Sequence, residues 1–586
     1  MNKLSYILLF LLASLSASAQ TFTLKGTVKE TNGTPLLGAT IVVKESHIGT
    51  STDMEGHFSI KAQVGQTLEV SYVGMKTQRI KIKGESLKLI LQEEAQALEG
   101  VVLTGYQKIQ NRVFTGAAAS VKMDNIKMEG VADISRMLEG RVAGLSIQNV
   151  TGSFGSAPRI NIRGGASIIG NVQPLWVIDG AIYEDLVPLS LDQLVSGDAV
   201  TLVSSAIAGL NATDIEDIQV LKDASATSMY GARALNGVIV ITTKSGKRDT
   251  PNRITYSYEQ SFRTIPSYKD FDLLNSQETM SLLQEMNSKG YFNLQNTLYG
   301  RRSGIYYQWY KGVSTINPNT GNYYYPNTLA AQAAFMKERE YANTNWFKHL
   351  FSINPIRSHT ITFSGGGKNS TSYASLGYYH DSGWTITDNV KRITANLKNT
   401  FYINDQLKAT FTAVGNLRSQ KAPGTFAQRK NTAVGAFERD FDINPFSYAL
   451  GTSRTLRPKD AQGNLEYYRN NWAPFNILEE YRNNYMKIDV LDFKIQAEAS
   501  YKVNPHLEAT ALVSARQAQT QSSHYITEKS NVVRAFRANE TPQVANDNIY
   551  LLKNKDNPLA PPQIALTNGG IFNKTETSLK SYMGRL

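Results

Sequence analysis

The sequence contains no cysteine among its 586 residues and only seven histidines. The lack of cysteine excludes disulfide bonds, thiolate metal ligands and a lipid-modified cysteine anchor. The histidines are scattered and show neither the spacing of a zinc site nor that of a hydrolase motif. We therefore expect no catalytic residues, no metal site and no cofactor, and we predict that the protein is not an enzyme.

Long apolar runs are also missing, apart from a short one near the start of the chain. Ile7 to Leu12 is apolar, Lys3 precedes it, and Ala17-Ser18-Ala19 follows as a small-residue cleavage site. This pattern predicts a signal peptide over residues 1–19. No other stretch approaches the roughly 18 apolar residues that a membrane helix needs. After export the chain is thus either soluble or embedded as a β-barrel, whose strands escape hydropathy analysis.

Concentrated charge is the third absence. The formal net charge of +12 comes from 61 basic and 49 acidic residues spread along the chain, so we predict no nucleic-acid binding. Tyrosine is abundant instead, with 30 residues against five tryptophans. Such a composition is common where strands and hydrated loops dominate.

The first mature segment, residues 20–92, has short strands separated by turns at intervals of about ten residues. Its apolar residues alternate with polar neighbours, as in Val28, Ala39, Ile41, Val43, Phe58 and Ile60. This pattern predicts a β-sandwich with one buried face per strand.

Residues 93–113 then break the pattern with a polar linker and the apolar run Val101–Tyr106. By itself that run predicts an edge strand or a packed linker.

Residues 114–247 have glycine-bounded strands and a short helix expected over Ile134–Leu138. The segment ends with LNATDIEDIQVLKDASATSMYGARALNGVIVITTKSGK, which places two apolar strands around a turn of small residues. Asp223 is positioned to cap a short helix, and Gly231 and Gly237 are free to adopt a positive φ.

From residue 248 to residue 586 the pattern changes to about eight long alternating strands. Short joints at Ile403–Gln406 and Val503–His506 alternate with long excursions, roughly Pro266–Arg357 and Gln420–Met486. A transmembrane barrel with tight turns at one end and large loops at the other has this asymmetry. We therefore predict the first part of an antiparallel outer-membrane β-barrel.

The amino-acid sequences of these segments resemble those of the SusC/RagA family of TonB-linked outer-membrane proteins. Leu210–Lys247 resembles the family's signature region, and GTVKETNGTPLLGAT resembles its N-terminal carboxypeptidase-regulatory-like domain. The resemblance implies a mainly β fold: a β-sandwich, an α+β plug domain, then a barrel. It implies a TonB box at Glu99, Val101, Val102, Leu103, Thr104, Gly105 and Tyr106. It also implies a plug signature of Arg163, Gly164, Asp179, Gly180, Asp223, Ala224, Tyr230, Gly231 and Gly237.

The resemblance further implies TonB-dependent import of a nutrient across the outer membrane of a Gram-negative, Bacteroidetes-like bacterium. The implied partners are TonB, a SusD-like surface lipoprotein acting as a lid, outer-membrane lipid and an oligosaccharide or peptide substrate. Eight strands cannot close the roughly 22-stranded barrel of plugged transporters, so we expect a C-terminally truncated chain. The alternatives are a surface adhesin or receptor that does not transport, or a non-functional transporter fragment.

Aromatic residues in the predicted outer loops are candidates for ligand binding, namely Tyr307, Trp309, Tyr324 and Trp472. Their rings can stack on sugars or pack against peptide side chains. They can equally form the loops' own cores or contact a lid partner. The sequence leaves these readings open, and with them the choice between glycan and peptide.

Overall fold

The computed structural model describes residues 21–30, 33–46, 48–72, 75–91, 101–106, 108–110, 116–131, 133–148, 158–162, 173–185, 207–318, 320–424, 426–431, 436–504 and 507–586. The chain divides into two compact units. The first comprises residues up to Val102 together with Ile109–Phe114, and the second comprises Leu103–Lys108 together with Thr115–Leu586. Each unit is described by itself.

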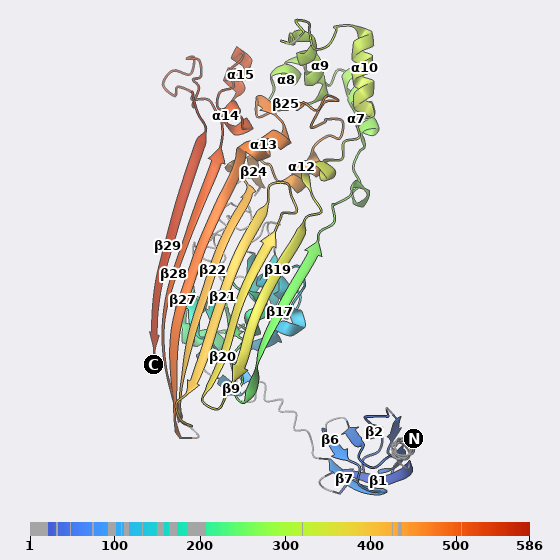
Figure 1. Cartoon of the computed structure of the whole chain (residues 1–586). Coiled ribbons are helices and arrows are strands. Elements are labelled where there is room, and N and C mark those ends of the chain that lie inside the picture. Colours follow the sequence, from blue (N-terminus) through green and yellow to red (C-terminus); the bar gives the residue numbers. More distant parts are fainter. Residues whose placement is uncertain are drawn as a thin grey trace, which may run out of the picture. The chain divides into compact units, whose positions relative to one another are not determined.

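The first unit contains two facing sheets, drawn in blue in Figure 1, with strand orders β4-β1-β7 and β3-β2-β5-β6. Its core consists of inward-facing apolar side chains such as Leu24, Val28, Ile41 and Leu68. The predicted β-sandwich is therefore present. Its strands are β1 (Phe22–Glu30), β2 (Thr40–Val43), β3 (Ile48–Ser51), β4 (His57–Ala62), β5 (Thr67–Tyr72), β6 (Met75–Lys81) and β7 (Ser86–Leu91).

The second unit begins with a small α+β domain built on a five-stranded sheet of order β10-β15-β16-β13-β14. Strand β16 lies between β15 and β13, and its consecutive residues Val238–Ile241 are all buried, so both faces of the strand are covered, which explains the uninterrupted apolar run. The helix expected over Ile134–Leu138 is present as α3. The strands are β10 (Ala118–Lys122), β11 (Leu145–Gln148), β12 (Arg159–Ile162), β13 (Leu175–Ile178), β14 (Ala181–Tyr183), β15 (Ile215–Leu221) and β16 (Val238–Thr243). The short helices are α2 (Met123–Ile126), α3, η1 (Ala212–Asp214), α6 (Ala224–Thr227) and η2 (Ser228–Ala234).

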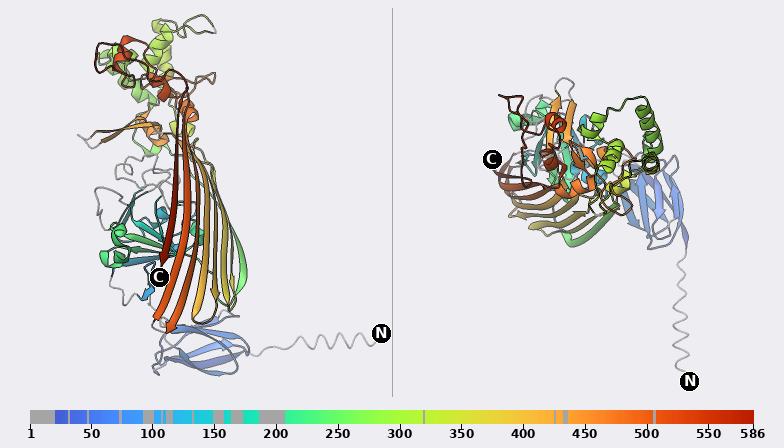
Figure 2. Two further views of the ribbon diagram at one scale, coloured as in Figure 1. Left: turned by 90° about the vertical axis from the view of Figure 1, so that its left-hand side faces the viewer. Right: turned by 90° about the horizontal axis from the view of Figure 1, so that it is seen from above.

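An eight-stranded antiparallel sheet follows, of order β17-β19-β20-β21-β22-β27-β28-β29. Figure 1 shows it curving along the α+β domain, and Figure 2 shows that domain on its concave side. The predicted number of strands and the short joint at Ile403–Gln406 are confirmed, whereas Pro505 and His506 of the second joint lie outside the described residues. The strands are β17 (Thr250–Phe262), β19 (Pro355–Gly366), β20 (Ser370–Asp381), β21 (Asn389–Tyr402), β22 (Leu407–Pro423), β27 (Asn484–Asn504), β28 (Leu507–Ile526) and β29 (Ile571–Arg585).

The two faces of this sheet have opposite polarity. On β21 the residues that point toward the α+β domain are polar and buried, including Arg392, Thr394 and Asn396. The alternate residues Ile393 and Leu397 are exposed on the other face. The same outward apolar pattern holds for Leu376, Phe401, Phe411, Leu417, Leu491, Phe493, Ile495 and Val513. A sheet that is polar inside and apolar outside is the reverse of a soluble barrel.

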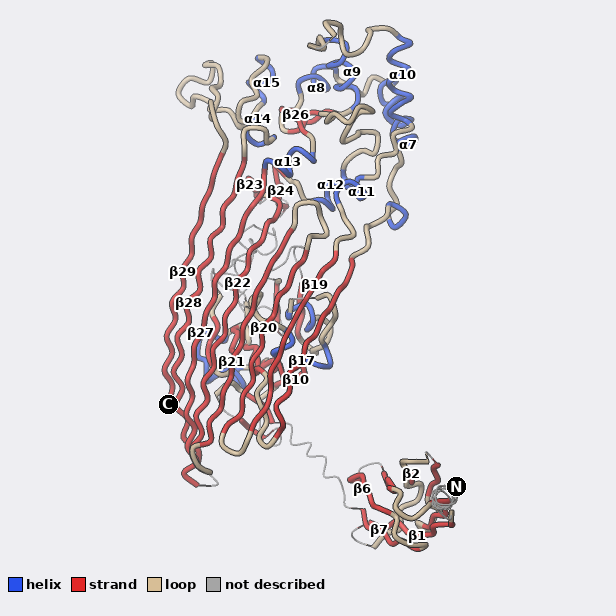
Figure 3. The backbone as a smooth tube through the Cα atoms, viewed as in Figure 1, coloured by secondary structure: helices blue, strands red, loops and turns tan. Residues whose placement is uncertain are grey.

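Long excursions between strands carry the helices at one end of the sheet, seen in blue at the top of Figure 3. Two lie where the sequence predicts them. A third, residues 527–570, is not among the long excursions that the sequence predicts. The first excursion holds α7 (Ser276–Ser288), α8 (Leu294–Tyr299), β18 (Arg302–Ser303), α9 (Ile305–Ser314), α10 (Leu329–Glu340) and α11 (Trp346–Leu350). The second holds β23 (Phe426–Asn431), β24 (Ala436–Phe441), α12 (Pro445–Gly451), β25 (Tyr468–Asn470), β26 (Ala473–Phe475) and α13 (Ile477–Asn483). The third holds α14 (Asn531–Ala535) and α15 (Pro542–Asp547).

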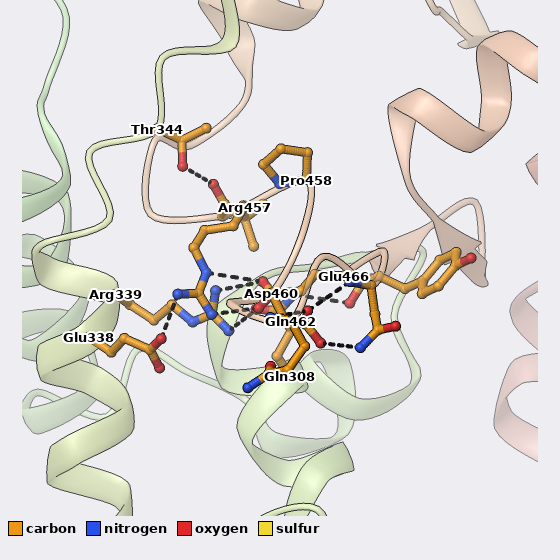
Figure 4. A network of polar contacts seen from close by, with 12 residues as sticks. Gln308, Glu338, Arg339, Thr344, Arg457, Pro458, Asp460, Gln462 and Glu466 are labelled. Carbon is orange, nitrogen blue, oxygen red and sulfur yellow. Dashed lines mark hydrogen bonds and ion pairs between the residues drawn. The ribbon is translucent and has the colours of Figure 1, made fainter. Parts of the chain in front are cut away.

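A charge network around the buried Arg339 joins the first two excursions (Figure 4). Glu466 accepts from Arg339 at 2.7 Å and from Arg457 at 2.6 Å, and Arg457 also reaches Glu338 at 2.5 Å. Arg339 is only 1% exposed, so its charge depends on this pairing. The large loops are therefore packed structures with their own core.

Within the described residues, no helix has both the length and the apolarity needed to cross a membrane.

Candidate functional site

The hairpin β13–β14 is the centre of the contacts between the α+β domain and the large sheet. Its two-residue turn is Asp179-Gly180, with φ values of +50° and +80°. Positive φ at both turn positions matches the right-handed twist of the flanking strands, and Asp-Gly is a preferred pair for such a turn. The turn projects Asp179 and two backbone carbonyls toward the large sheet.

The Asp179 carboxylate is buried and fully engaged. It accepts hydrogen bonds from the Thr243 backbone N–H at 3.0 Å and from the Thr243 hydroxyl at 2.6 Å. It also forms an ion pair with Lys398 of β21 at 3.0 Å. Burial alone would raise the pKa of this carboxyl, but Lys398, Lys494 and the Thr243 donors outweigh it and hold the pKa below its usual 3.8. Asp179 is therefore an anion that connects the hairpin to strand β21 of the large sheet.

Strand β27 holds the backbone of the same turn. The Lys494 ammonium donates to the Ile178 carbonyl at 3.2 Å, and the Gln496 amide donates to the Asp179 carbonyl at 2.8 Å. Lys494 is 1% exposed. These contacts use backbone carbonyls, so they depend on the shape of the turn more than on its side chains.

Strand β28 holds the end of the hairpin through Arg516. Its guanidinium makes two parallel bonds to Asp492, at 3.0 and 2.9 Å, and donates to the Glu184 carbonyl at 2.8 Å. The same guanidinium lies 3.8 Å from the centroid of the Tyr183 ring. Paired and stacked arginines of this kind are geometrically specific contacts.

A second contact lies before β15. Arg392 of β21 donates to the carbonyls of Ala208 and Leu210, at 2.9 and 3.1 Å. The Tyr373 hydroxyl of β20 donates to Asp214 at 2.9 Å. The α+β domain is thus fixed to the sheet at two separate places.

The segment Thr104–Tyr106 packs against the first of these places. The Tyr230 hydroxyl donates to the Thr104 carbonyl, and the rings of Tyr106 and Tyr230 lie 4.5 Å apart. Gly105 has a φ of +83°, and a Cβ there would lie 2.3 Å from the Tyr230 hydroxyl oxygen. Only glycine fits this turn, so the glycine of the predicted TonB box has a structural requirement.

Arg585 of β29 connects this segment to the hairpin turn. Its Nη1 donates to the Gly105 carbonyl at 3.1 Å and approaches the Gly180 carbonyl at 3.5 Å. Its guanidinium lies 4.7 Å from the centroid of the Tyr106 ring. The predicted residues Thr104, Gly105, Tyr106, Asp179, Gly180 and Tyr230 are therefore brought together at one site.

The remaining predicted residues have other positions. Val101, Val102 and Leu103 form β8, which pairs with β9 (Lys108–Gln110). Asp223 accepts from the Ala226 N–H at 2.8 Å as the expected helix cap, and Ala224 starts that helix. Gly231 and Gly237 have the expected positive φ, +61° and +88°. Glu99, Arg163 and Gly164 lie outside the described residues.

The four aromatic candidates do not form one exposed surface. Tyr307, Trp309 and Trp472 are buried, and Trp309 stacks on Tyr325 with centroids 5.9 Å apart. Tyr324 is 51% exposed. Ligand binding by these residues stays a prediction.

Sequence reasoning missed the sheet residues that hold the site, namely Lys398, Lys494, Gln496, Arg516 and Arg585. The available signal was their position, because each is a long polar side chain at an inward-facing place of an alternating strand. That alternation identifies a polar interior but not the partner of each residue.

Acid is expected to weaken the hairpin contact. The pKa of Asp179 in the folded protein lies below its ordinary value of 3.8. The Asp179 carboxylate therefore contributes its full stabilisation at any pH above 3.8. The contribution falls as the pH drops through the lower, folded pKa. Hydrogen exchange of the β13–β14 amides, compared between pH 7 and pH 3, measures this loss. In Asp179→Asn the acid-dependent part should disappear, and a loss of equal size in that variant would contradict the assignment.

Comparison with known proteins identifies the two N-terminal parts of the chain. Residues 24–103 match the family of CarboxypepD_reg-like domains, and residues 110–238 match the TonB-dependent Receptor Plug Domain. The chain is 29% identical over 534 residues to the TonB-dependent receptor SusC of Bacteroides thetaiotaomicron, covering 88% of this chain and 47% of SusC. It is 28% identical to the TonB-dependent receptor P26 of Formosa agariphila, covering 66% of this chain and 33% of that protein.

Among solved structures, the RagAB peptide importer in its open-open state matches with a TM-score of 0.52 and 24% identity. The match covers 72% of this chain and 43% of the other, and it concerns the fold. The chain spans about half the length, or less, of the curated relatives that it matches. It is mainly β, with a regulatory-like sandwich, a plug and a β-barrel-like strand region. The chain is therefore a homologue of the TonB-dependent receptor SusC, with a CarboxypepD_reg-like domain followed by a TonB-dependent Receptor Plug Domain.

Proposed function

We propose that this protein takes part in TonB-dependent import of a nutrient, an oligosaccharide or a peptide oligomer, across a Gram-negative outer membrane. In this proposal residues 1–19 direct export, and residues 248–586 supply barrel wall and outer loops. Residues 114–247 plug the barrel, residues 93–113 carry the TonB box, and residues 20–92 form the regulatory-like sandwich. A SusD-like lipoprotein covers the loops.

The outward apolar face of the large sheet supports a location in the outer membrane. On β27 the outward residues from Leu491 to Val503 are apolar, whereas Lys487 and Asp489 above them are charged and exposed. These thirteen residues of a strand tilted by about 45° span roughly the 25 Å apolar band of an outer-membrane barrel. Outer-membrane lipid is the solvent that fits this face.

The single observation that carries the transport mechanism is the position of Thr104–Tyr106. This segment contacts the plug through Tyr230 and the barrel wall through Arg585, at the turn that Asp179 anchors. An extended segment that leaves this position can add to the sheet edge of another protein through main-chain hydrogen bonds. Engagement by TonB would then act directly on the plug–barrel contacts.

A binding experiment tests the proposal. The protein in detergent should retain the purified periplasmic domain of TonB, and deletion of Val101–Tyr106 should abolish that retention. The adhesin alternative predicts that TonB is not retained by either form. Equal retention by both forms would place the TonB contact elsewhere and contradict the assignment of the box.

Because the chain has no cysteine, a single introduced thiol reports on the box. Thr104 is fully buried, so Thr104→Cys should react slowly with a maleimide. Adding Tyr230→Phe removes the hydroxyl donor to residue 104 and should raise the labelling rate several-fold, since a lost hydrogen bond is worth about 1 kcal/mol. As a matched control, Tyr72→Phe in the first unit should leave the rate unchanged. An unchanged rate in Tyr230→Phe would show that Tyr230 does not hold the segment.

A further inference from the structure

Arg469 lies where the three large excursions meet. It belongs to β25 in the second excursion, opposite Ser303 of β18 in the first. Its guanidinium lies 5.0 Å from the centroid of the Tyr307 ring, also in the first excursion. In the third excursion, Glu540 accepts from Arg469 Nη2 at 2.8 Å. One arginine therefore contacts all three loops.

This guanidinium is almost fully buried but only partly satisfied. The Arg469 side chain is 3% exposed. Its Nε and Nη1 are buried and have no hydrogen-bond acceptor among the described residues. Arginine has five N–H donors, and buried donors are nearly always bonded in folded proteins. The group therefore has unused capacity to bind an anion.

Neighbouring polar atoms share this state. Within the described part of the chain, the Ser303 hydroxyl, the Gln308 amide oxygen and the Trp472 indole N–H are buried without a hydrogen-bond partner. Ser303 pairs with Arg469 across the strands, and Gln308 donates its amide N–H to the Tyr467 carbonyl at 3.0 Å. Trp472 follows three residues after Arg469 in a turn where Asn471 and Trp472 both have positive φ, +52° and +60°. Strained turns with unsatisfied polar atoms concentrate at binding sites.

The Glu540 side chain differs from its partner because it is 50% exposed. The Glu540 carboxylate is therefore already partly hydrated and can leave Arg469 at little cost. Arg469 cannot be left without an anion, because its charge is buried. An incoming carboxylate can take its place and keep the buried charge balanced. Glu540 thus occupies the position of a carboxylate ligand.

We infer that Arg469, with Ser303 and Tyr307, forms a binding site for a carboxylate-bearing oligomer, which exchanges with Glu540. The carboxylate belongs either to the C-terminus of a peptide or to a uronic-acid unit of a glycan. Hydroxyls or amide N–H groups of the same oligomer satisfy Gln308, and the Tyr307 ring packs beside the guanidinium. This inference deepens the proposed import function and rests on it for the role of the loops.

Two pairs of probes test the site by calorimetry on the protein in detergent. The first pair is N-acetyl-tetraalanine with a free carboxylate or with a C-terminal amide. The second is tetragalacturonate or its methyl ester. We expect one charged probe to bind at least about tenfold more tightly than its neutral form, because charge-assisted bonds to arginine are lost in the neutral form. The pair that discriminates identifies the source of the carboxylate.

Variants separate recognition from structure. Arg469→Gln should remove the preference for the charged probe, and Arg469→Lys should restore part of it. Glu540→Gln should bind the charged probe several-fold more tightly, because the internal competitor is gone; a purely structural pair would give no gain. Glu528→Gln is the matched control, since Glu528 is also half-exposed and pairs with Arg537 at 3.1 Å in the same excursion.

Failure of both charged probes to bind Glu540→Gln, or equal binding of the charged and neutral forms in both pairs, would overturn the inference. The Glu540→Gln result does not depend on whether Arg469→Gln folds. Binding is measured without TonB, so its failure leaves the assignment of the box untouched. Conversely, deletion of Val101–Tyr106 should leave carboxylate binding unchanged.

Discussion

Replacement of Asp179 by alanine is expected to cost about 3–5 kcal/mol of local stability at the plug hairpin, the usual effect of breaking a buried ion pair. The variant removes the anion that Lys398 contacts at 3.0 Å and that offsets the nearby buried charge of Lys494. It also removes the acceptor for two Thr243 donors. Lys494 is 1% exposed and the Lys398 side chain is 13% exposed, so neither ammonium is well hydrated while the plug is in place, and we expect the hairpin to detach or reorganise.

Hydrogen exchange measures this effect locally, which matters because a chain with several domains has no single unfolding free energy. We expect exchange of the β13–β14 amides to accelerate by a factor of about 100 or more, the equivalent of about 3 kcal/mol. The matched control is Asp217→Ala, on the same sheet, where a partly exposed carboxylate accepts from the Ser120 hydroxyl at 2.9 Å. Similar protection in the two variants would show that Asp179 does not anchor the plug.

Much of the fold follows from local patterns in the sequence. The alternation of β21 and β22 gives both the strands and their two faces, and the joint at Ile403–Gln406 gives the turn between them. The run Val238–Ile241 gives a strand covered on both sides. These features were predictable because each depends on residues within one strand or turn.

The third excursion was harder to predict because β29 lacks a regular apolar face. Its outward-facing residues include Lys574, Glu576 and Lys580, so most of the strand resembles a polar loop. Only the segment after Ser578 alternates clearly. The edge position of β29 in this chain leaves few cross-strand constraints on its composition.

The contacts at the candidate site were beyond sequence reasoning for a different reason. Arg585 lies 480 positions from Gly105, and Gln496 lies 317 positions from Asp179. Nothing in local periodicity specifies which inward residue meets which carbonyl of the plug. Resemblance to a known family predicts the motif residues, whereas only the three-dimensional structure identifies their partners.

Replacement of Leu103 by proline is expected to reduce nutrient uptake to background while surface binding continues. Proline removes the backbone N–H that main-chain pairing with TonB needs, and it fixes φ near −65°. Leu103→Ala keeps that N–H and is the matched control, for which we expect most uptake to remain. If the protein is an adhesin that does not transport, neither Leu103→Pro nor Leu103→Ala would change the energy-dependent accumulation of the ligand.

The most direct test compares energy-dependent accumulation of a labelled ligand with its surface binding, in cells producing the wild-type protein, Leu103→Pro or Leu103→Ala. The proposed mechanism predicts equal surface binding in all three, with accumulation lost only in Leu103→Pro and in cells without TonB. Wild-type accumulation by Leu103→Pro would contradict it.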